Sequence, residues 1–131
     1  MIKATDIADG IVLHLDPDEL EAGGGRCSAS GAGRVQGSHF FVCIASDERS
    51  GNWVPLFSAP GPGRELVPNE AKSGHPRWCE SATWYPSDQV WQAPHAAAIA
   101  AAIAGGDLSG AGVRNALSEA GVDLIYAAAL G

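Results

Sequence analysis

The two residues best suited to acid–base chemistry are a histidine and a serine that border neighbouring apolar stretches. His39 opens one stretch and Ser58 closes the next. If the stretches pair as strands, the loop between them could place both side chains at one end of a sheet. The imidazole could then move protons near neutral pH, and the hydroxyl could donate a hydrogen bond to a charged oxygen. An ordinary strand-end histidine is the alternative.

Basic side chains gather in the loops predicted for the middle of the chain, where they could converge on a phosphate or an acidic partner. They are Arg49, Arg64, Lys72, His75 and Arg77. Most of the four tryptophans should lie in the core. Trp78 lies in a polar stretch and is the best candidate for exposure, where it could stack on a base. We take Arg49, Arg64, Arg77 and Trp78 as candidate substrate-binding residues; simple solvation of these charges is the alternative.

The cysteines and glycines give no pattern typical of a metal or cofactor site. Cys27, Cys43 and Cys79 are odd in number and widely spaced, which favours reduced thiols over a disulfide framework. The sequence has no CxxC or HxxxH pair to start a zinc site. The glycine-rich segment 23–26 lacks the GxxxxGK[ST] phosphate loop. We therefore expect neither a metal ion nor a cofactor.

Charge and hydropathy narrow the classes of function. The net charge of −7 repels nucleic acid at long range and disfavours nonspecific binding. Residues 26–80 carry a slight excess of positive charge, so a local basic site is compatible with this balance. No apolar run approaches the roughly 18 residues of a membrane span, and the N-terminus lacks a secretory signal. We expect a cytoplasmic protein without a membrane partner.

Short apolar segments separated by turn residues predict a mainly β domain. They are 10–15, 39–45, 53–58, 64–67, 82–85 and 89–91. Segment 39–45 is apolar almost throughout, so it should be a central strand buried on both faces. It should form a hairpin with 53–58 through a wide loop, with Pro55 at an edge or bulge. The pattern predicts a single domain over 1–131, with a small β-barrel over 1–93 that includes a mobile glycine-rich loop over 21–38.

The remaining residues, 94–131, should form a C-terminal helical segment. The alanine-rich stretch from His95 to Ala104 predicts a helix that ends at Gly105. A second helical segment should run from Asp107 to a stop at Gly121. The apolar faces of these helices should pack on the barrel or on a second copy of the chain.

Several short motifs, taken in order, resemble the MazF/PemK family. They are segments 10–17, 39–46 and 54–58, the glycine-rich loop between the first two, and Asp88-Gln89-Val90. Members of that family are toxin endoribonucleases of bacterial toxin–antitoxin pairs, and they are usually homodimers. The resemblance implies a small SH3-like β-barrel of the MazF/PemK/CcdB type, mainly β with C-terminal helices.

The resemblance also implies a site, from which this chain departs at one position. Where the family has its catalytic arginine and a following proline, this chain has His39 and Phe40. Ser58 matches the residue that helps to bind the scissile phosphate. Arginine stabilises the charge that develops at phosphorus, so His39 would have to act as acid or base instead. We expect cleavage of single-stranded RNA by metal-independent transesterification, in a homodimer with an antitoxin-like partner.

The absent arginine supports a second hypothesis from a different class. A barrel that has lost catalysis could act as a protein-binding module or inhibitor, for example in the attack or defence system of a phage or other mobile element. The acidic surface and the number of aromatic residues fit this hypothesis, because aromatic side chains are enriched at interface hot spots. Its partner would then be an antitoxin-like protein or a host target.

Overall fold

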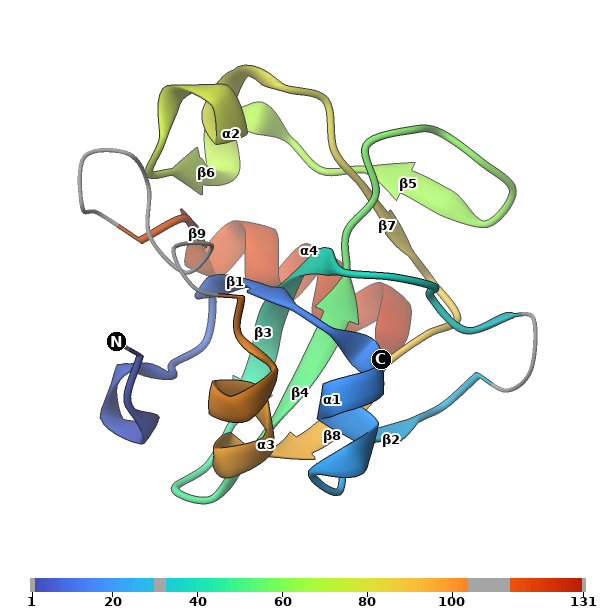
Figure 1. The fold of residues 1–131 in the computed structure, drawn as a ribbon. Helices are drawn as coiled ribbons and strands as arrows, with labels where there is room; N and C mark the ends of the chain where they lie inside the picture. Colours follow the sequence, from blue (N-terminus) through green and yellow to red (C-terminus); the bar gives the residue numbers. More distant parts are fainter. Residues whose placement is uncertain (1, 30–32, 104–113, 131) are drawn as a thin grey trace.

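The centre of the fold is a five-stranded antiparallel sheet with the strand order β1-β3-β4-β8-β2 (Figure 1). The computed structural model describes residues 2–29, 33–103 and 114–130. The strands of this sheet are β1 Val12–Leu15, β2 Arg26–Cys27, β3 His39–Ser46, β4 Ser50–Pro55 and β8 Trp91–Pro94. The apolar segment that begins at His39 is an interior strand, as the sequence predicts, because β3 pairs with β1 on one side and β4 on the other.

The side chains of β3 alternate between two apolar layers, because successive residues of a strand point to opposite faces of the sheet. Phe41 and Cys43 enter one buried cluster, and Val42 and Ile44 enter the other. All four side chains are buried. The prediction that this strand is buried on both faces is therefore confirmed.

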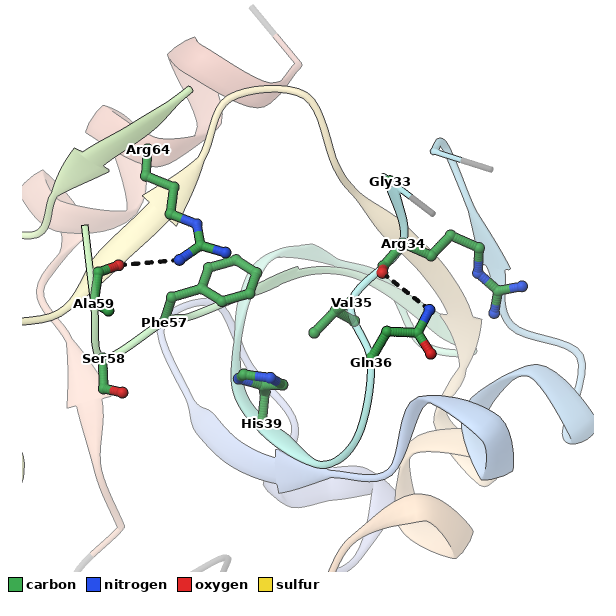
Figure 2. Close-up of a pocket in the computed structure, with 9 residues that line it drawn as sticks. All are labelled: Gly33, Arg34, Val35, Gln36, His39, Phe57, Ser58, Ala59 and Arg64. Carbon is green, nitrogen blue, oxygen red and sulfur yellow. Dashed lines mark hydrogen bonds between the residues drawn. The ribbon is translucent and has the colours of Figure 1, made fainter. Parts of the chain in front are cut away.

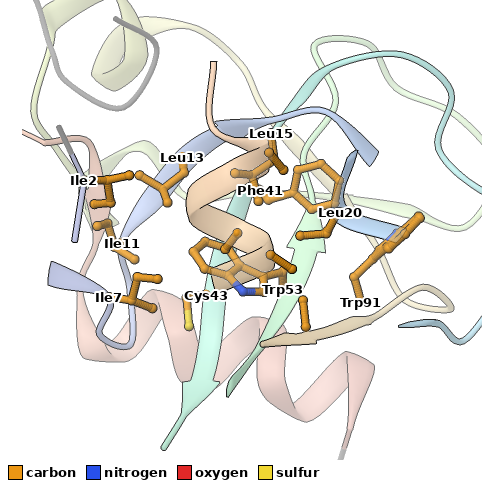
Figure 3. Close-up of a cluster of buried hydrophobic side chains, with 14 of the residues drawn as sticks. Ile2, Ile7, Ile11, Leu13, Leu15, Leu20, Phe41, Cys43, Trp53 and Trp91 are labelled. Atoms are coloured by element: carbon orange, nitrogen blue, oxygen red, sulfur yellow. The ribbon is translucent and has the colours of Figure 1, made fainter. Parts of the chain in front are cut away.

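Helices cover both faces of the sheet. Helices α1, Pro17–Ala22, and α3, His95–Ala101, pack together over the first face, and α4, Glu119–Ala129, lies across the second (Figure 1). Figure 3 shows the first cluster, in which side chains from β1, β3, β4 and β8 meet those of α1 and α3. Its largest members, Trp53 and Trp91, are fully buried, and removing either indole would cost about 3–5 kcal/mol of stability.

Smaller elements lie beyond the end of the sheet at which β3 begins (Figure 1). Two short antiparallel ladders join β5 to β7 and β6 to β9. Their bounds are β5 Arg64–Leu66, β6 Lys72–Ser73, β7 Trp84–Pro86 and β9 Ala116–Leu117. The short helices of this region are the 3-10 turn η3 Asn69–Ala71 and the α-helix α2 Pro76–Glu80, whereas the 3-10 turn η1 Ala4–Asp6 contacts α3.

The sheet is open. β1 and β2 form its two edges, and within the described ranges no ladder joins them. The expectation of a closed barrel over residues 1–93 is therefore wrong at this level, whereas the expectation of a mainly β fold with a C-terminal helix is confirmed. The two helix-covered faces explain the difference, because the apolar side chains are buried between the sheet and its helices rather than inside a ring of strands.

The glycine-rich segment 21–38 contains regular structure that the sequence does not predict. Helix α1 extends to Ala22, and β2 follows it. The Asp16 carboxylate accepts the N–H of Asp18 at 2.9 Å, and Pro17 occupies the first helical position. These two residues have the chemistry of a turn, and they start a helix equally well.

The hairpin between β3 and β4 is tighter than predicted. Three residues, 47–49, connect the strands, because the Asp47 carboxylate accepts the backbone N–H groups of Arg49 and Ser50 at 2.8 Å each. The register shifts between Cys43 and Ala45, and Pro55 is the last residue of β4. The irregularity in the sheet is therefore in β3 rather than at Pro55.

The C-terminal helices also differ from the prediction. Helix α3 ends at Ala101, and the predicted cap at Gly105 lies outside the described residues. Ser118 caps α4, which continues through Gly121, so the predicted stop there is wrong. A Cβ atom on Gly121 would lie 3.0 Å from that of Ala71, so this glycine permits close packing instead of ending the helix. No helix in the described part of the chain is long and apolar enough to cross a membrane.

Candidate functional site

His39 is the first residue of β3, and its ring is held in one tautomer. Its Nδ1 lies 3.1 Å from the backbone oxygen of Leu56. A carbonyl oxygen only accepts, so Nδ1 carries the hydrogen and the neutral ring keeps a lone pair on Nε2. The ring is half-buried and packs at 5.1 Å from the Phe57 ring, measured between centroids. His39 therefore offers a base with a fixed orientation.

Two hollows meet at His39, and both are also lined by Phe57 and Ser58. The Arg64 hollow has a volume of about 440 Å³ and is completed by residues 33–36, Ala59 and Arg64. The Trp78 hollow has a volume of about 600 Å³ and extends towards α2. His39 and Ser58 thus lie on the wall that the two hollows share. The predicted pair is brought together around one surface.

Arg64 supplies positive charge to the Arg64 hollow, which His39 also lines, and the Phe57 ring lies between the two side chains in Figure 2. Its guanidinium lies 3.7 Å above the Phe57 ring and donates to the backbone oxygen of Ala59 at 3.1 Å. That bond uses one of the five N–H donors of the group. The Ser58 hydroxyl is exposed at the same rim. A phosphate at this rim would find both a cation and a hydroxyl donor.

Trp78 lies between the Trp78 hollow and the second apolar cluster. Its side chain is only 7% exposed, so the prediction that it is the exposed tryptophan is wrong. Helix α2 turns the indole inward. The indole and Phe40 ring centroids lie 6.4 Å apart, and Nζ of Lys72 lies 4.6 Å above the indole centroid. The exposed aromatic side chain here is Phe40, which stacks on His14 at 5.0 Å.

Lys72 has a structural position rather than a place in the site. Its Nζ donates to the backbone oxygen of Ser81 at 2.6 Å and to Oγ1 of Thr83 at 2.9 Å. Burial lowers the pKa of this ammonium group. Of the other basic candidates, Arg77 lines the Trp78 hollow, and Arg49 lies in the hairpin turn at the opposite end of β3. At roughly 3.3 Å per residue, that end lies more than about 20 Å from His39.

No family model, curated protein or solved structure matches this chain. The resemblance to the MazF/PemK family therefore rests on the short motifs alone.

Several residues that line the hollows were not among the candidate site residues. Arg34 lines the Arg64 hollow, but its guanidinium pairs with Glu21 and lies over Trp91 at 4.9 Å, away from His39 in Figure 2. His14 and Asn115 line the Trp78 hollow from β1 and the segment before β9. Only the fold brings these distant segments to His39, so no local pattern could have identified them.

Within residues 2–29, 33–103 and 114–130, no three His, Cys, Asp or Glu side chains are grouped so that they could hold a metal ion. The cysteines also lie away from the two hollows. Burial raises the pKa of the Cys43 thiol to about 12, and burial likewise raises that of Cys27. A thiol that keeps its proton is a weak nucleophile. The titratable side chains that line the two hollows are therefore histidines and arginines.

Proposed function

We propose that the chain is a MazF/PemK-like endoribonuclease on an SH3-like scaffold, acting on single-stranded RNA in the cytoplasm without a metal ion. The observation that carries this proposal is His39, whose Nε2 lone pair is available on the wall shared by two hollows. RNA cleavage requires a base beside a site for the phosphate. Ser58 and Arg64 supply the phosphate contacts.

The proposed reaction is an internal transesterification. Nε2 of His39 takes the proton from a ribose 2′-hydroxyl, and the 2′-oxygen attacks the adjacent phosphorus. The bond from phosphorus to the 5′-oxygen breaks, and that oxygen takes a proton from solvent. The products are a 2′,3′-cyclic phosphate and a 5′-hydroxyl. The imidazolium that forms keeps its Nδ1–H bond to Leu56, so the ring does not have to turn during the step.

The phosphate gains negative charge in the transition state, and two groups at the rim can stabilise it. Arg64 has donors left after its bond to Ala59, and the exposed hydroxyl of Ser58 can donate one hydrogen bond. Arg77 adds a further cation at the Trp78 hollow. These local groups offset the net charge of −7, which otherwise repels RNA.

The test is to incubate the purified protein with a long single-stranded RNA in EDTA and to map the new ends. We expect discrete cuts with cyclic phosphate ends, and we expect none in an RNA methylated at every 2′-oxygen. His39→Ala should abolish the cuts while thermal unfolding shows an intact fold. Equal cleavage by His39→Ala would remove His39 from the mechanism, and the absence of any cut would refute the proposed activity.

A second candidate function is a protein-binding module, favoured by the outer face of α4. Tyr126 and Leu130 lie four residues apart on one side of this helix and its last turn, and each is more than 40% exposed. Exposed apolar side chains of this size commonly mark an interface. We propose that this face also accounts for a homodimer. A Tyr126→Asp variant should then elute as a monomer in size-exclusion chromatography, and a wild-type monomer would count against this role of α4.

A further inference from the structure

His75 is fixed at its backbone and at its ring. The backbone N–H of His75 donates to the Asn115 side-chain oxygen at 2.9 Å. Its ring nitrogen Nδ1 accepts the backbone N–H of Arg77 at 3.0 Å, so His75 caps helix α2. The side chain lines the Trp78 hollow, as His39 does. A side chain held at both ends loses little freedom when a ligand binds.

The two histidines are held in opposite tautomers. A backbone N–H only donates, so Nδ1 of His75 carries no hydrogen and its Nε2 does. His39 has the reverse arrangement, with its hydrogen on Nδ1 and its lone pair on Nε2. The lining of the same hollow therefore includes one proton acceptor and one fixed N–H donor. An RNA phosphodiester needs both, a base for the hydroxyl and donors for the phosphate oxygens.

We propose that His75 is a substrate-binding residue that donates its Nε2–H to a non-bridging oxygen of an RNA phosphate in the Trp78 hollow. This inference rests on the proposed function and names the group that holds the phosphate opposite His39. The exposed ring of Phe40 also lines this hollow and provides a face on which the adjoining base stacks. Arg77 adds a positive charge near this phosphate.

The cap and the donor can be separated by substitution. Asparagine is a good N-cap, because its side-chain oxygen accepts the same backbone N–H, but it is too short to place a donor where Nε2 lies. His75→Asn should therefore keep α2 and lose the contact with phosphate. His75→Ala should lose both the cap of α2 and the contact with phosphate. Arg49→Ala is the control, because Arg49 lies in the hairpin turn at the opposite end of β3 and lines neither hollow.

The binding experiment uses a single-stranded RNA in which every 2′-hydroxyl is methylated, so that no cleavage occurs. We expect His75→Asn to bind this probe roughly ten- to a hundredfold more weakly than the wild type, which is the typical cost of losing a hydrogen bond to a charged group. Its melting temperature should match that of the wild type. Arg49→Ala should bind the probe almost as tightly as the wild type.

Nitrogen-15 NMR of the imidazole rings gives an independent readout at pH about 8, where an ordinary histidine is neutral. We expect the Nε2–H tautomer for His75 and the Nδ1–H tautomer for His39. Wild-type affinity in His75→Asn, or the Nδ1–H tautomer at His75, overturns this inference and leaves the role of His39 intact. A wild-type protein that binds the probe but never cuts ordinary RNA refutes the proposed activity alone. A wild-type protein that cuts ordinary RNA but does not bind the probe overturns this inference alone, and failure of both measurements refutes both.

Discussion

Two histidines at opposite ends of the β3–β4 hairpin have opposite surroundings. His39 is half-buried on the wall of two hollows, and its Nε2 remains available. His95 is only 4% exposed, and its Nε2 lies 2.8 Å from the backbone oxygen of Asp47. The backbone N–H of His95 also donates to the oxygen of Arg49 at 2.8 Å. His95 fastens α3 to the hairpin turn.

The comparison shows that the surroundings of a histidine decide whether its ring can contact a ligand or only holds parts of the fold together. The bond from His95 to Asp47 fixes its hydrogen on Nε2, and its Nδ1 is buried without a partner in the structure. A substrate cannot reach that nitrogen. His39 begins β3 and His95 directly follows β8, yet of these two only His39 combines a fixed ring with access to solvent.

The largest effect should appear when each of the two histidines is replaced by asparagine in a separate variant and the rate of RNA cleavage is measured. His39→Asn should lower the cleavage rate by about 10²–10⁴-fold, the usual contribution of a general base. His95→Asn should cleave at nearly the wild-type rate at a temperature where it is folded. If both variants cleave equally well, the proposed contrast between the two ends is wrong.

Urea unfolding of the same two variants should give the opposite ranking, with the larger loss of stability in His95→Asn. His95→Asn should lose about 1–3 kcal/mol, because it leaves buried polar groups without their partner. His39→Asn should change the free energy of unfolding by less than about 1 kcal/mol, since the amide can still donate to Leu56. A larger loss in His39→Asn would show that its role is mainly structural.

A smaller effect, on RNA binding, should distinguish Arg64 in the Arg64 hollow from Arg49 in the β3–β4 turn. Arg64→Ala should weaken binding of the methylated RNA by about tenfold, because it removes a charge-assisted contact beside Ser58. Arg49→Ala, more than about 20 Å away along β3, should bind within about twofold of the wild type. Filter binding at fixed salt measures both. Equal losses would indicate that charge alone, rather than a site, governs RNA binding.

The smallest effect should be on stability at low pH, and it should come from Asp47 in the hairpin turn. The backbone N–H of Arg49, and next that of Ser50, hold the pKa of the Asp47 carboxyl below its ordinary value. The folded state therefore binds this proton less readily than the unfolded state does. The stabilisation is complete above the unfolded pKa of about 3.9 and is lost as the pH falls through the lower folded pKa.

Asp47→Asn provides the test, because it keeps an oxygen acceptor and removes the titration. Melting temperatures between pH about 2 and 6 should fall less steeply in Asp47→Asn than in the wild type. Parallel curves would mean that this carboxylate does not contribute to the acid dependence. The variant should cleave RNA like the wild type, since the turn lies far from His39.

The parts of the fold that the sequence predicts correctly are those decided by local patterns. The continuous apolar run from Phe41 to Ile44 can be satisfied only between two covered faces, so its interior position follows from composition. The start of α1 was missed because Asp16 and Pro17 are equally typical of a turn. Trp78 was misplaced because its polar neighbours in the sequence do not show which face of α2 packs inward.

The site was less predictable than the fold, because its groups come from distant segments. His39 and Ser58 could be paired through a single expected hairpin. The fixed tautomer of His39 depends on Leu56 O, and that of His75 depends on a helix that the sequence did not predict. The contribution of Asn115 requires a contact between residues 40 positions apart. Such contacts leave no periodic signal in one sequence.

The bond between Asn115 and His75 has a consequence for the timing of assembly during protein synthesis. Asn115 is itself held by β1, because its backbone oxygen accepts the N–H of Val12 at 2.9 Å. A nascent chain that has not yet reached residue 115 already contains His39 and Ser58, but it cannot anchor His75. Contacts between distant segments form late, because closing long loops costs entropy first. This hollow therefore cannot be completed until residue 115 has been synthesised and has reached His75.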